Sequence, residues 1–264
     1  MGVDYAGTVE AVGAKVTRFK PGDPVFGGRN GAFAEYVAVR EDRNIVAKPD
    51  NVSFAEAASV PIAALTALQA LRDKGHLEAG QKVLVNGASG AVGTFAVQIA
   101  KALGAEVTGV CSTRNLELVR GIGADHAIDY TREDVTQRPE RYDLIVDTVM
   151  THGLFEYKKI LKPEGRFVIV GGVEKGDWLG PMSAPLKAFV LRPFIGPNFG
   201  FMLAELNPKD LAFVAELMQS GKVKPVLDRT YTLAQTGEAL AYVEAGHARG
   251  KVVIDMDPGA AARQ

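Results

Sequence analysis

The residues best suited to chemistry are the small ones between Gly87 and Gly93, which directly follow the apolar run Val83–Val85. A strand, a glycine-rich turn and a helix in this order let the backbone approach the pyrophosphate of a dinucleotide, and the free N–H groups of the helix start face its charge. In the usual G-x-G-x-x-G pattern the first position is glycine, but here it is Ala88; Gly90 and Gly93 hold the close-approach and helix-packing positions. The pattern predicts a dinucleotide site, with a purely structural turn as the alternative.

A second group of polar residues follows the next predicted strand, in Cys111-Ser-Thr-Arg-Asn115. NAD-binding domains place Asp or Glu about 20 residues after the glycines, where the carboxylate binds the ribose 2′-hydroxyl. No carboxylate stands there, and Glu117 falls on the following helix. A hydroxyl and a guanidinium instead suit a 2′-phosphate. Ser112 and Arg114 therefore favour NADPH, and the alternative is a solvated loop with one surface arginine.

The metal-ligating residue types are few and scattered. Cys111 is the single cysteine, and the four histidines lie far apart in the sequence. A structural zinc site takes four ligands and a catalytic one takes three, mostly Cys and His, so we predict no metal site. Cys111 ends an apolar strand and is most simply a small buried residue.

Composition places the chain among soluble globular proteins. Its 264 residues are 47% hydrophobic and 23% charged, with a net charge of -1, which gives no electrostatic reason to expect nucleic acid or a membrane as partner. The apolar stretch 179–206 is interrupted by prolines and basic residues, so we do not expect it to span a membrane. The single cysteine and the absence of a signal-like start favour the cytoplasm.

Two different residue patterns along the chain predict two kinds of structure. Residues 5–13 and 32–39 alternate like antiparallel strands, and Ser53 with Glu56 forms a capping box before a long helical pattern that runs to Arg72. From Gln81 onward, five short apolar strands alternate with helices, which predicts an α/β, doubly wound parallel sheet. Helices are further expected over 208–219 and 233–245, and strands over 223–232 and 251–256.

Several segments together resemble one family, the zinc-independent medium-chain dehydrogenase/reductases of the NADPH:quinone oxidoreductase and enone reductase branch. The matching segments are Ala6–Gly13, Lys20–Gly27, Gly31–Val37, Asn86–Gly93, Gly123–Tyr130 and Gly246–Val253. The resemblance implies a Rossmann domain over 61–223, inserted in a β-rich GroES-like catalytic domain over 1–60 and 224–264. Family members carry further strands before the point equivalent to Gly2, so we expect this chain to begin inside that domain, and we name no catalytic residue.

The resemblance also implies which residues surround the cofactor NADPH. The pyrophosphate would be lined by Ser89, Gly90, Ala91, Val92 and Gly93. The 2′-phosphate would lie among Ser112, Arg114 and Tyr130, and the nicotinamide near Gly171 and Gly172. His247 and Arg249 would return close to the cofactor. Each of Tyr130, the glycine pair and the His247 segment has a packing, turn or solvated-loop alternative.

The activity expected from the resemblance is hydride transfer from NADPH to a small acceptor, a quinone or an α,β-unsaturated carbonyl, without a metal. Two alternatives remain open: a non-catalytic NADPH-binding protein, and a zinc-free NADP-dependent alcohol dehydrogenase. A homodimer is the oligomer we consider, with residues 179–207 as a candidate pocket wall or subunit contact.

Overall fold

The computed structural model describes residues 1–170 and 198–256 and divides into two compact units. The first unit combines residues 1–65 with 205–264, and the second is the continuous stretch 66–204. The domain bounds implied by the resemblance put residues 205–223 with the second unit. In the structure their helix α7 (Pro208–Gln219) contacts strand β3 (Ile45–Ala47), and Asn51 Nδ2 donates a hydrogen bond to the Met218 carbonyl (3.0 Å).

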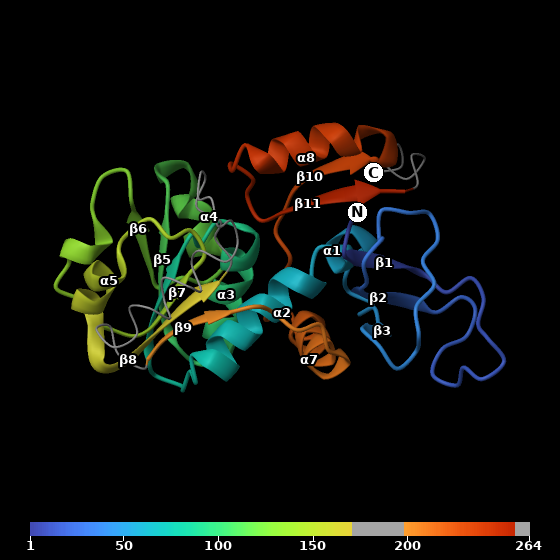
Figure 1. The fold of residues 1–264 in the computed structure, drawn as a ribbon, viewed down its shortest axis with the longest axis horizontal. Coiled ribbons are helices and arrows are strands. Elements are labelled where there is room, and N and C mark those ends of the chain that lie inside the picture. Colours follow the sequence, from blue (N-terminus) through green and yellow to red (C-terminus); the bar gives the residue numbers. More distant parts are fainter. Residues whose placement is uncertain (171–197, 257–264) are drawn as a thin grey trace. The chain divides into compact units, whose positions relative to one another are not determined.

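A six-stranded sheet forms the second unit, in the order β6-β5-β4-β7-β8-β9 (Figure 1). All neighbouring strands are parallel. Their bounds are β4 (Lys82–Asn86), β5 (Glu106–Cys111), β6 (His126–Asp129), β7 (Tyr142–Asp147), β8 (Leu161–Val170) and β9 (Phe199–Met202). Central strands with buried side chains on both faces explain the near-continuous apolar runs of the sequence. The predicted doubly wound parallel sheet is confirmed.

Helices cover both faces of this sheet (Figure 1). Helix α3 (Ala91–Ala102) contacts β4 and β5, and α4 (Leu116–Gly121) contacts β5 and β6. Helix α5 (Leu154–Ile160) contributes Tyr157 and Ile160 to a buried cluster with side chains from β4 to β8. Turns η2 (Thr113–Asn115) and η3 (Val135–Gln137) complete the connections between strands. These connections place the turns that carry the candidate site at the carboxyl ends of the strands.

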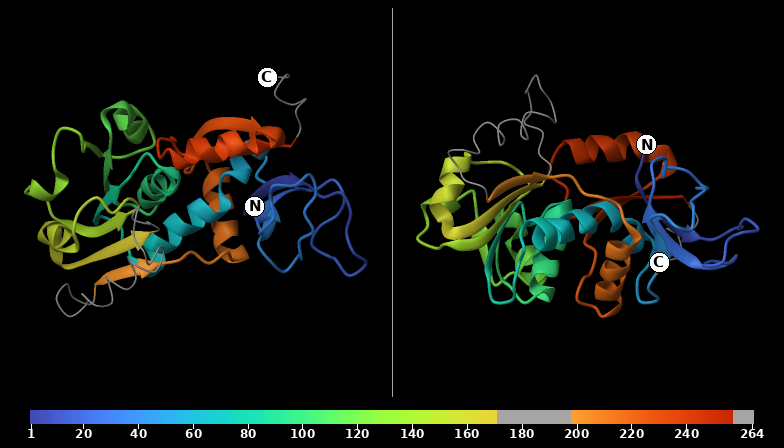
Figure 2. Two further views of the ribbon diagram at one scale, coloured as in Figure 1. Left: turned by 45° about the horizontal axis from the view of Figure 1, so that its top comes forward. Right: turned by 60° about the horizontal axis from the view of Figure 1, so that its bottom comes forward.

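The first unit holds two small sheets. Strands β1 (Asp4–Thr8), β2 (Pro24–Gly28) and β3 pair antiparallel. Strands β10 (Leu227–Thr232) and β11 (Lys251–Asp255) pair parallel, and they are joined through η5 (Leu233–Gln235) and helix α8 (Thr236–Glu244), which lies beside both (Figure 2). This β-rich unit provides the expected GroES-like part of the fold.

The capping box at Ser53 is present, but the helix that follows it is divided. Glu56 N–H donates to Ser53 Oγ and the Glu56 carboxylate accepts from Ser53 N–H, which starts α1 (Phe54–Ala58). Pro61 then begins a new helix, α2 (Pro61–Gln69), since proline favours a first helical position over an interior one. A π-helical turn, η1 (Ala70–Lys74), ends the run. The prediction of one long helix is therefore wrong in this detail.

Two strand predictions also need correction. Residues 32–39 alternate like a strand but form none in the structure, and Tyr36 is 75% exposed. Alternation alone cannot make a strand, because its backbone groups need a pairing partner. Conversely, β9 was missed, since its four residues include Gly200 and follow a proline-rich stretch. Its pairing with β8 supplies the partner that the local sequence does not announce.

Candidate functional site

The candidate site lies at the carboxyl edge of the parallel sheet, where the chain order reverses. Strand β4 has β5 on one side and β7 on the other, so the connections leaving β4 and β7 run to opposite sides. Open α/β sheets bind ligands in the crevice at such a switch point. The glycine-rich turn from Gly87 to Gly93 begins here, directly after β4 and before α3.

Three glycines shape this turn for different reasons. Gly87 has φ +82°, a conformation that side chains other than glycine rarely adopt. A Cβ on Gly93 would overlap the Gly87 carbonyl oxygen and lie 2.8 Å from Ala88 Cα, so the turn and α3 pack backbone against backbone. A Cβ on Gly90 would meet only the Gly87 carbonyl oxygen, at 3.3 Å. The protein's own packing requires Gly93, whereas Gly90 leaves an approach to the backbone open.

The N-terminus of α3 carries an unbalanced positive end. Its N-cap is Gly90, which has no side chain to cap the helix, and its first turn contains no acidic residue. The aligned peptide groups give a helix start roughly half a positive charge, which favours a bound anion. Ser89, Ala91 and Val92 are partly exposed beside it, and Gly93 is buried behind them. The arrangement suits a phosphate group.

The ends of β5 and β6 place the other predicted phosphate ligands close together. Tyr130 N–H donates to the Cys111 carbonyl (3.1 Å), so Tyr130 and Ser112 follow neighbouring strand ends. Arg114 and Tyr130 are exposed, and Tyr130 keeps 60% of its surface accessible. The Glu117 carboxylate accepts from Arg120 Nη1 at 2.8 Å on α4. The structure thus groups Ser112, Arg114 and Tyr130 along one edge.

A buried carboxylate, Asp129, is already engaged by its own neighbours. It accepts hydrogen bonds from the Thr113 hydroxyl and from the backbone N–H and hydroxyl of Thr131, and Arg132 Nε lies 3.4 Å away. The Thr113 bond is the largest of the causes that lower the pKa of Asp129 below its ordinary value, followed by burial, which opposes it, and by the Thr131 bonds. This carboxylate fixes the β5–α4 loop.

Asn115 joins the two predicted phosphate regions, and the sequence reasoning assigned it no role. Its side-chain nitrogen donates to Ser89 Oγ at 2.9 Å and to Ser112 Oγ at 3.2 Å. Asn115 is 5% exposed, and its Oδ1 has no hydrogen-bond partner among the described residues. The signal that could have revealed it is a polar residue in the loop directly after the second strand.

A second buried polar group ties β4 to β7 at the switch point. Asn86 Nδ2 donates to Asp147 Oδ1 (2.9 Å) and to the Tyr157 hydroxyl (2.8 Å). Asp147 Oδ1 also accepts from the backbone N–H groups of Val149 and Met150. Burial, and then the charge of Asp147, raise the pKa of Tyr157, which therefore stays a neutral phenol. Asn86 and Asp147 are each a polar residue at the end of an apolar strand, and this pattern in the sequence could have indicated the buried pair.

The remaining predicted residues fall either outside the described residues or in the first unit. Gly171 and Gly172 fall outside the described residues, as do residues 179–197 of the candidate pocket wall. His247 and Arg249 belong to the first unit, in the exposed connection between α8 and β11, where Arg249 N–H donates to Asp228 Oδ2 at 2.9 Å. Their proximity to a cofactor stays a prediction.

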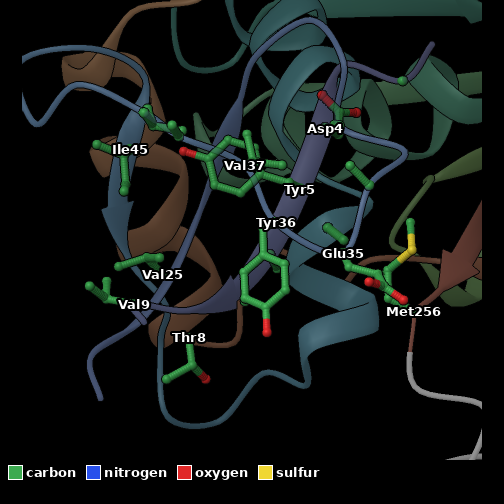
Figure 3. Close-up of a pocket in the computed structure, with 18 of the residues that line it drawn as sticks. Asp4, Tyr5, Thr8, Val9, Val25, Glu35, Tyr36, Val37, Ile45 and Met256 are labelled. Carbon is green, nitrogen blue, oxygen red and sulfur yellow. The ribbon is translucent and has the colours of Figure 1, made fainter. Parts of the chain in front are cut away.

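The first unit contains a largely apolar pocket of about 790 Å³ (Figure 3). Its lining comes from β1, from the segments 9–13 and 32–39 and from residues 251–254 of β11, with Val16, Phe19 and Met256 among the others. At its edge Asp4 accepts from the Ile62 backbone N–H (2.9 Å) and from Lys251 Nζ (3.3 Å). Burial raises the pKa of Asp4 against the opposing effect of Lys251. The pocket offers space for an apolar group and places one charge pair beside it.

Metal-type side chains do not gather in the part of the chain that the structure describes, where no group of three or more His, Cys, Asp or Glu could hold an ion. Cys111 is buried, and burial followed by the charge of Asp129 raises the pKa of its thiol to about 11. Within the same ranges, no helix is both long and apolar enough to cross a membrane.

Comparison with known proteins gives two matching family models and many relatives. Residues 122–254 match the family described as zinc-binding dehydrogenase, and residues 1–50 match the alcohol dehydrogenase GroES-like domain. The chain is 36% identical to 2-methylene-furan-3-one reductase of Solanum lycopersicum, over 97% of this chain and 63% of that protein. It is 35% identical to NAD(P)H oxidoreductase RTN4IP1, mitochondrial, of Danio rerio, over 97% of this chain and 72% of that one.

A solved structure agrees with these matches. The quinone oxidoreductase from Coxiella burnetii superposes with a TM-score of 0.84 at 29% identity, over 97% of this chain and 79% of that chain. The chain thus spans less than two thirds of the tomato reductase and about four fifths of the bacterial structure. Two family models in the expected order, the relatives and the shared fold lead to one conclusion: the chain belongs to the medium-chain dehydrogenase/reductase family.

Proposed function

We propose that this protein is an NADPH-dependent oxidoreductase that transfers hydride to a quinone or an α,β-unsaturated carbonyl. One arrangement carries the proposal: the uncapped start of α3 lies at the same sheet edge as Ser112 and Arg114. The nearby carboxylates of Glu117 and Asp129 already have partners, Arg120 and Thr113 respectively. The relatives named as a furanone reductase, an NAD(P)H oxidoreductase and a quinone oxidoreductase support the same activity.

The residues at the sheet edge fit the phosphates of NADPH. Gly90 leaves the turn backbone approachable, and the α3 start favours an anion such as the pyrophosphate. The Arg114 guanidinium offers paired, charge-assisted donors that suit a 2′-phosphate. The Asp129 carboxylate already accepts hydrogen bonds from the Thr113 hydroxyl and from the hydroxyl and backbone N–H of Thr131, so it is engaged within its own loop and not offered to a ribose 2′-hydroxyl. The described residues therefore favour NADPH over NADH.

The chain's own contribution to the reaction is orientation and exclusion of water. When bound, NADPH supplies the hydride, and the reactivity belongs to its nicotinamide ring. Ser89 and the turn backbone would hold the pyrophosphate, while Ser112, Arg114 and Tyr130 would hold the adenosine end. Holding the pyrophosphate and the 2′-phosphate would fix the position of the nicotinamide relative to the acceptor. Such positioning can lower the activation barrier of hydride transfer by several kcal/mol. The proton that completes reduction would come from solvent.

A metal-free reaction is part of the proposal. Its support is the sequence, whose single cysteine and scattered histidines do not supply the Cys/His ligand sets typical of zinc sites. A quinone or an enone is already electron-poor, so it accepts hydride more readily than a simple ketone does. The family model's description as zinc-binding makes a direct metal analysis of the purified protein the appropriate check.

Turnover is the measurement that tests the proposal. NADPH oxidation should be followed by absorbance with a simple quinone and with a short enone, and NADH should be compared under the same conditions. We expect oxidation with at least one acceptor and a preference for NADPH. Tight NADPH binding without oxidation would instead support the non-catalytic alternative, and oxidation of alcohols with NADP⁺ would support the alcohol dehydrogenase.

Several finer assignments belong to the same proposal. We propose that the cofactor is also contacted by Gly171, Gly172, His247 and Arg249. We further propose a homodimer as the oligomeric state and the cytoplasm as the cellular compartment. Contacts are testable by alanine variants at His247 and Arg249, the assembly by light scattering, and the compartment by fractionation. The Danio rerio relative is named as mitochondrial, so fractionation should include organelles.

A further inference from the structure

Asn115 lies where it can act on two loops at once. It belongs to η2 after β5, and its side-chain nitrogen donates both to Ser89 in the glycine-rich turn and to Ser112 at the end of β5 (2.9 and 3.2 Å). Ser89 and Asn115 are 26 positions apart, so the contact is a feature of the folded unit. Asn115 itself is 5% exposed, whereas both serines are partly exposed.

The direction of these two hydrogen bonds leaves both serine hydroxyl hydrogens available. A serine hydroxyl has one O–H donor and two acceptor lone pairs. Because Asn115 Nδ2 donates to both oxygens, each hydroxyl can use its own hydrogen elsewhere. Among the described residues, neither hydroxyl donates a hydrogen bond to another group. A phosphate accepts hydrogen bonds and offers none when fully ionised, so it requires this orientation.

The ordinary role of such an asparagine is absent. Asn115 occupies the N-cap position of α4, where Asn side chains usually accept from the first backbone N–H groups. It makes no such bond, and its buried Oδ1 has no partner among the described residues. Its side chain is directed instead to the two serines. A merely local, helix-capping explanation therefore does not account for its placement.

We propose that Asn115 is a positioning residue that turns the Ser89 and Ser112 hydroxyls into donors for the phosphates of NADPH. Ser89 would donate to the pyrophosphate and Ser112 to the 2′-phosphate, so one buried amide coordinates both ends of the adenosine part. This inference rests on the proposed NADPH function and names a residue that the function itself does not require. An amide in the opposite orientation would accept from both serines and turn their hydrogens inward.

The sharpest test is reversal of the amide's polarity at constant shape. In Asn115→Asp the ionised carboxylate can only accept, so both hydroxyls would donate inward, and a negative charge would stand near the phosphates. Asn115→Leu removes the donors without adding charge. Hydrogen bonds to charged groups are strong enough that we expect NADPH to bind about tenfold more weakly in Asn115→Leu, and weaker still in Asn115→Asp. NADH, which lacks the 2′-phosphate, should lose less.

A mutant cycle separates positioning from a general structural effect. Dissociation constants for NADPH and NADH should be measured by nicotinamide fluorescence for Asn115→Leu in the wild-type and Ser89→Ala/Ser112→Ala backgrounds. If Asn115 acts through the two hydroxyls, its loss should have little effect once they are absent. The matched control for Asn115→Asp is Asn51→Asp. It makes the same substitution at an amide of the first unit that donates to the Met218 carbonyl, and it should leave both dissociation constants unchanged.

The failures of the two ideas are distinguishable. Wild-type protein that binds neither nucleotide would overturn the proposed function. If the wild-type protein binds NADPH and both Asn115→Asp and Asn115→Leu keep the same affinity, the inference alone would be overturned. An Asn115→Leu loss that persists fully without the two serine hydroxyls, or that is equal for NADPH and NADH, would also overturn it, because it would indicate disturbed folding of the loop.

Discussion

Gly109 in β5 faces Ala88 in the glycine-rich turn so closely that a Cβ on Gly109 would lie 2.9 Å from the Ala88 Cβ. The same atom would lie 2.5 Å from Val119 Cγ1 on α4. Real Cβ atoms do not approach so closely, so the strand leaves room for the alanine that replaces the first glycine of the usual pattern. The departure from the pattern is thus accommodated by a glycine on the neighbouring strand.

Gly109→Ala should therefore destabilise the protein. Overpacking of a well-packed core typically costs about 1–3 kcal/mol, and we expect a loss of that size in the free energy of unfolding measured with urea. Gly109→Ala/Ala88→Gly should recover part of it, since one of the two overlaps is relieved. Gly121→Ala in α4 is the control: apart from its chain neighbours and the backbone of its own helix, no described atom lies within 4 Å of its added Cβ, so stability should stay unchanged or rise. Equal losses at both positions would contradict the packing argument.

Gly90 and Gly93 should respond differently to alanine. Gly93→Ala forces a side chain into the Gly87 carbonyl, so the melting temperature should fall and NADPH binding with it. Gly90→Ala meets that carbonyl only at 3.3 Å, so the melting temperature should stay near that of the wild type. Its affinity for NADPH should nevertheless decrease, because the added methyl group obstructs the approach to the turn backbone. Undiminished NADPH affinity in Gly90→Ala would remove this turn as the pyrophosphate site.

Arg114→Asp tests the choice of cofactor. Loss of a charge-assisted contact with the 2′-phosphate should weaken NADPH binding by about 10–100-fold, with a much smaller effect on NADH. Arg120→Asp makes the same charge change six positions later, on α4, at an exposed arginine whose partner is Glu117. It should leave the ratio of the two affinities almost unchanged. Isothermal titration with both nucleotides measures the ratio, and parallel losses in the two variants would indicate only a general electrostatic effect.

Asp129 and Thr113 predict a pH-dependent contribution to stability. The Thr113 hydrogen bond is the largest cause lowering the pKa of Asp129 in the folded protein. A carboxyl group whose folded pKa lies below its unfolded value stabilises the fold above the unfolded value of 3.8, and this stabilisation is lost as the pH falls through the folded value. Thr113→Val should consequently be less stable than wild type at pH 7, and the difference should shrink in strong acid.

Urea unfolding at several pH values measures this difference. The control is Thr230→Val, an exposed strand position in β10, where no pH-dependent change is expected. A Thr113→Val difference that stays constant down to strongly acidic pH would show that the hydroxyl acts on packing and not on the charge of Asp129.

The sequence predicted what depends on local patterns. The glycine turn, the apolar strands β4 to β8 and the Ser53 capping box follow from neighbouring residues, and the structure confirms them. Strand β9 and the placement of α7 depend on partners distant in the chain, so periodicity could not reveal them. Residues 32–39 show the converse, a strand-like pattern without a paired partner.

The site followed the same division. Ser112 and Arg114 could be proposed as cofactor ligands because their position after β5 has a known chemical meaning, and that role stays a prediction. Asn115 could not be, because its relation to Ser89 exists only after the turn and the loop have folded against each other. The hydrogen bond from Thr113 to Asp129 likewise forms only in the folded protein, since the two residues are 16 positions apart.

The second unit is one uninterrupted stretch, whereas the first needs both ends of the chain. Asp4 and Lys251, which pair in the first unit, are separated by 247 positions. On the ribosome, where synthesis starts at the N-terminus, the parallel sheet can therefore close while the β-rich unit still waits for its last strand. Nascent chains that end at Ala204 and are followed by a linker long enough to span the exit tunnel should resist protease across residues 82–170 but remain susceptible within residues 1–50. The N-terminal residues would then be synthesised first but would complete their folding after the second unit.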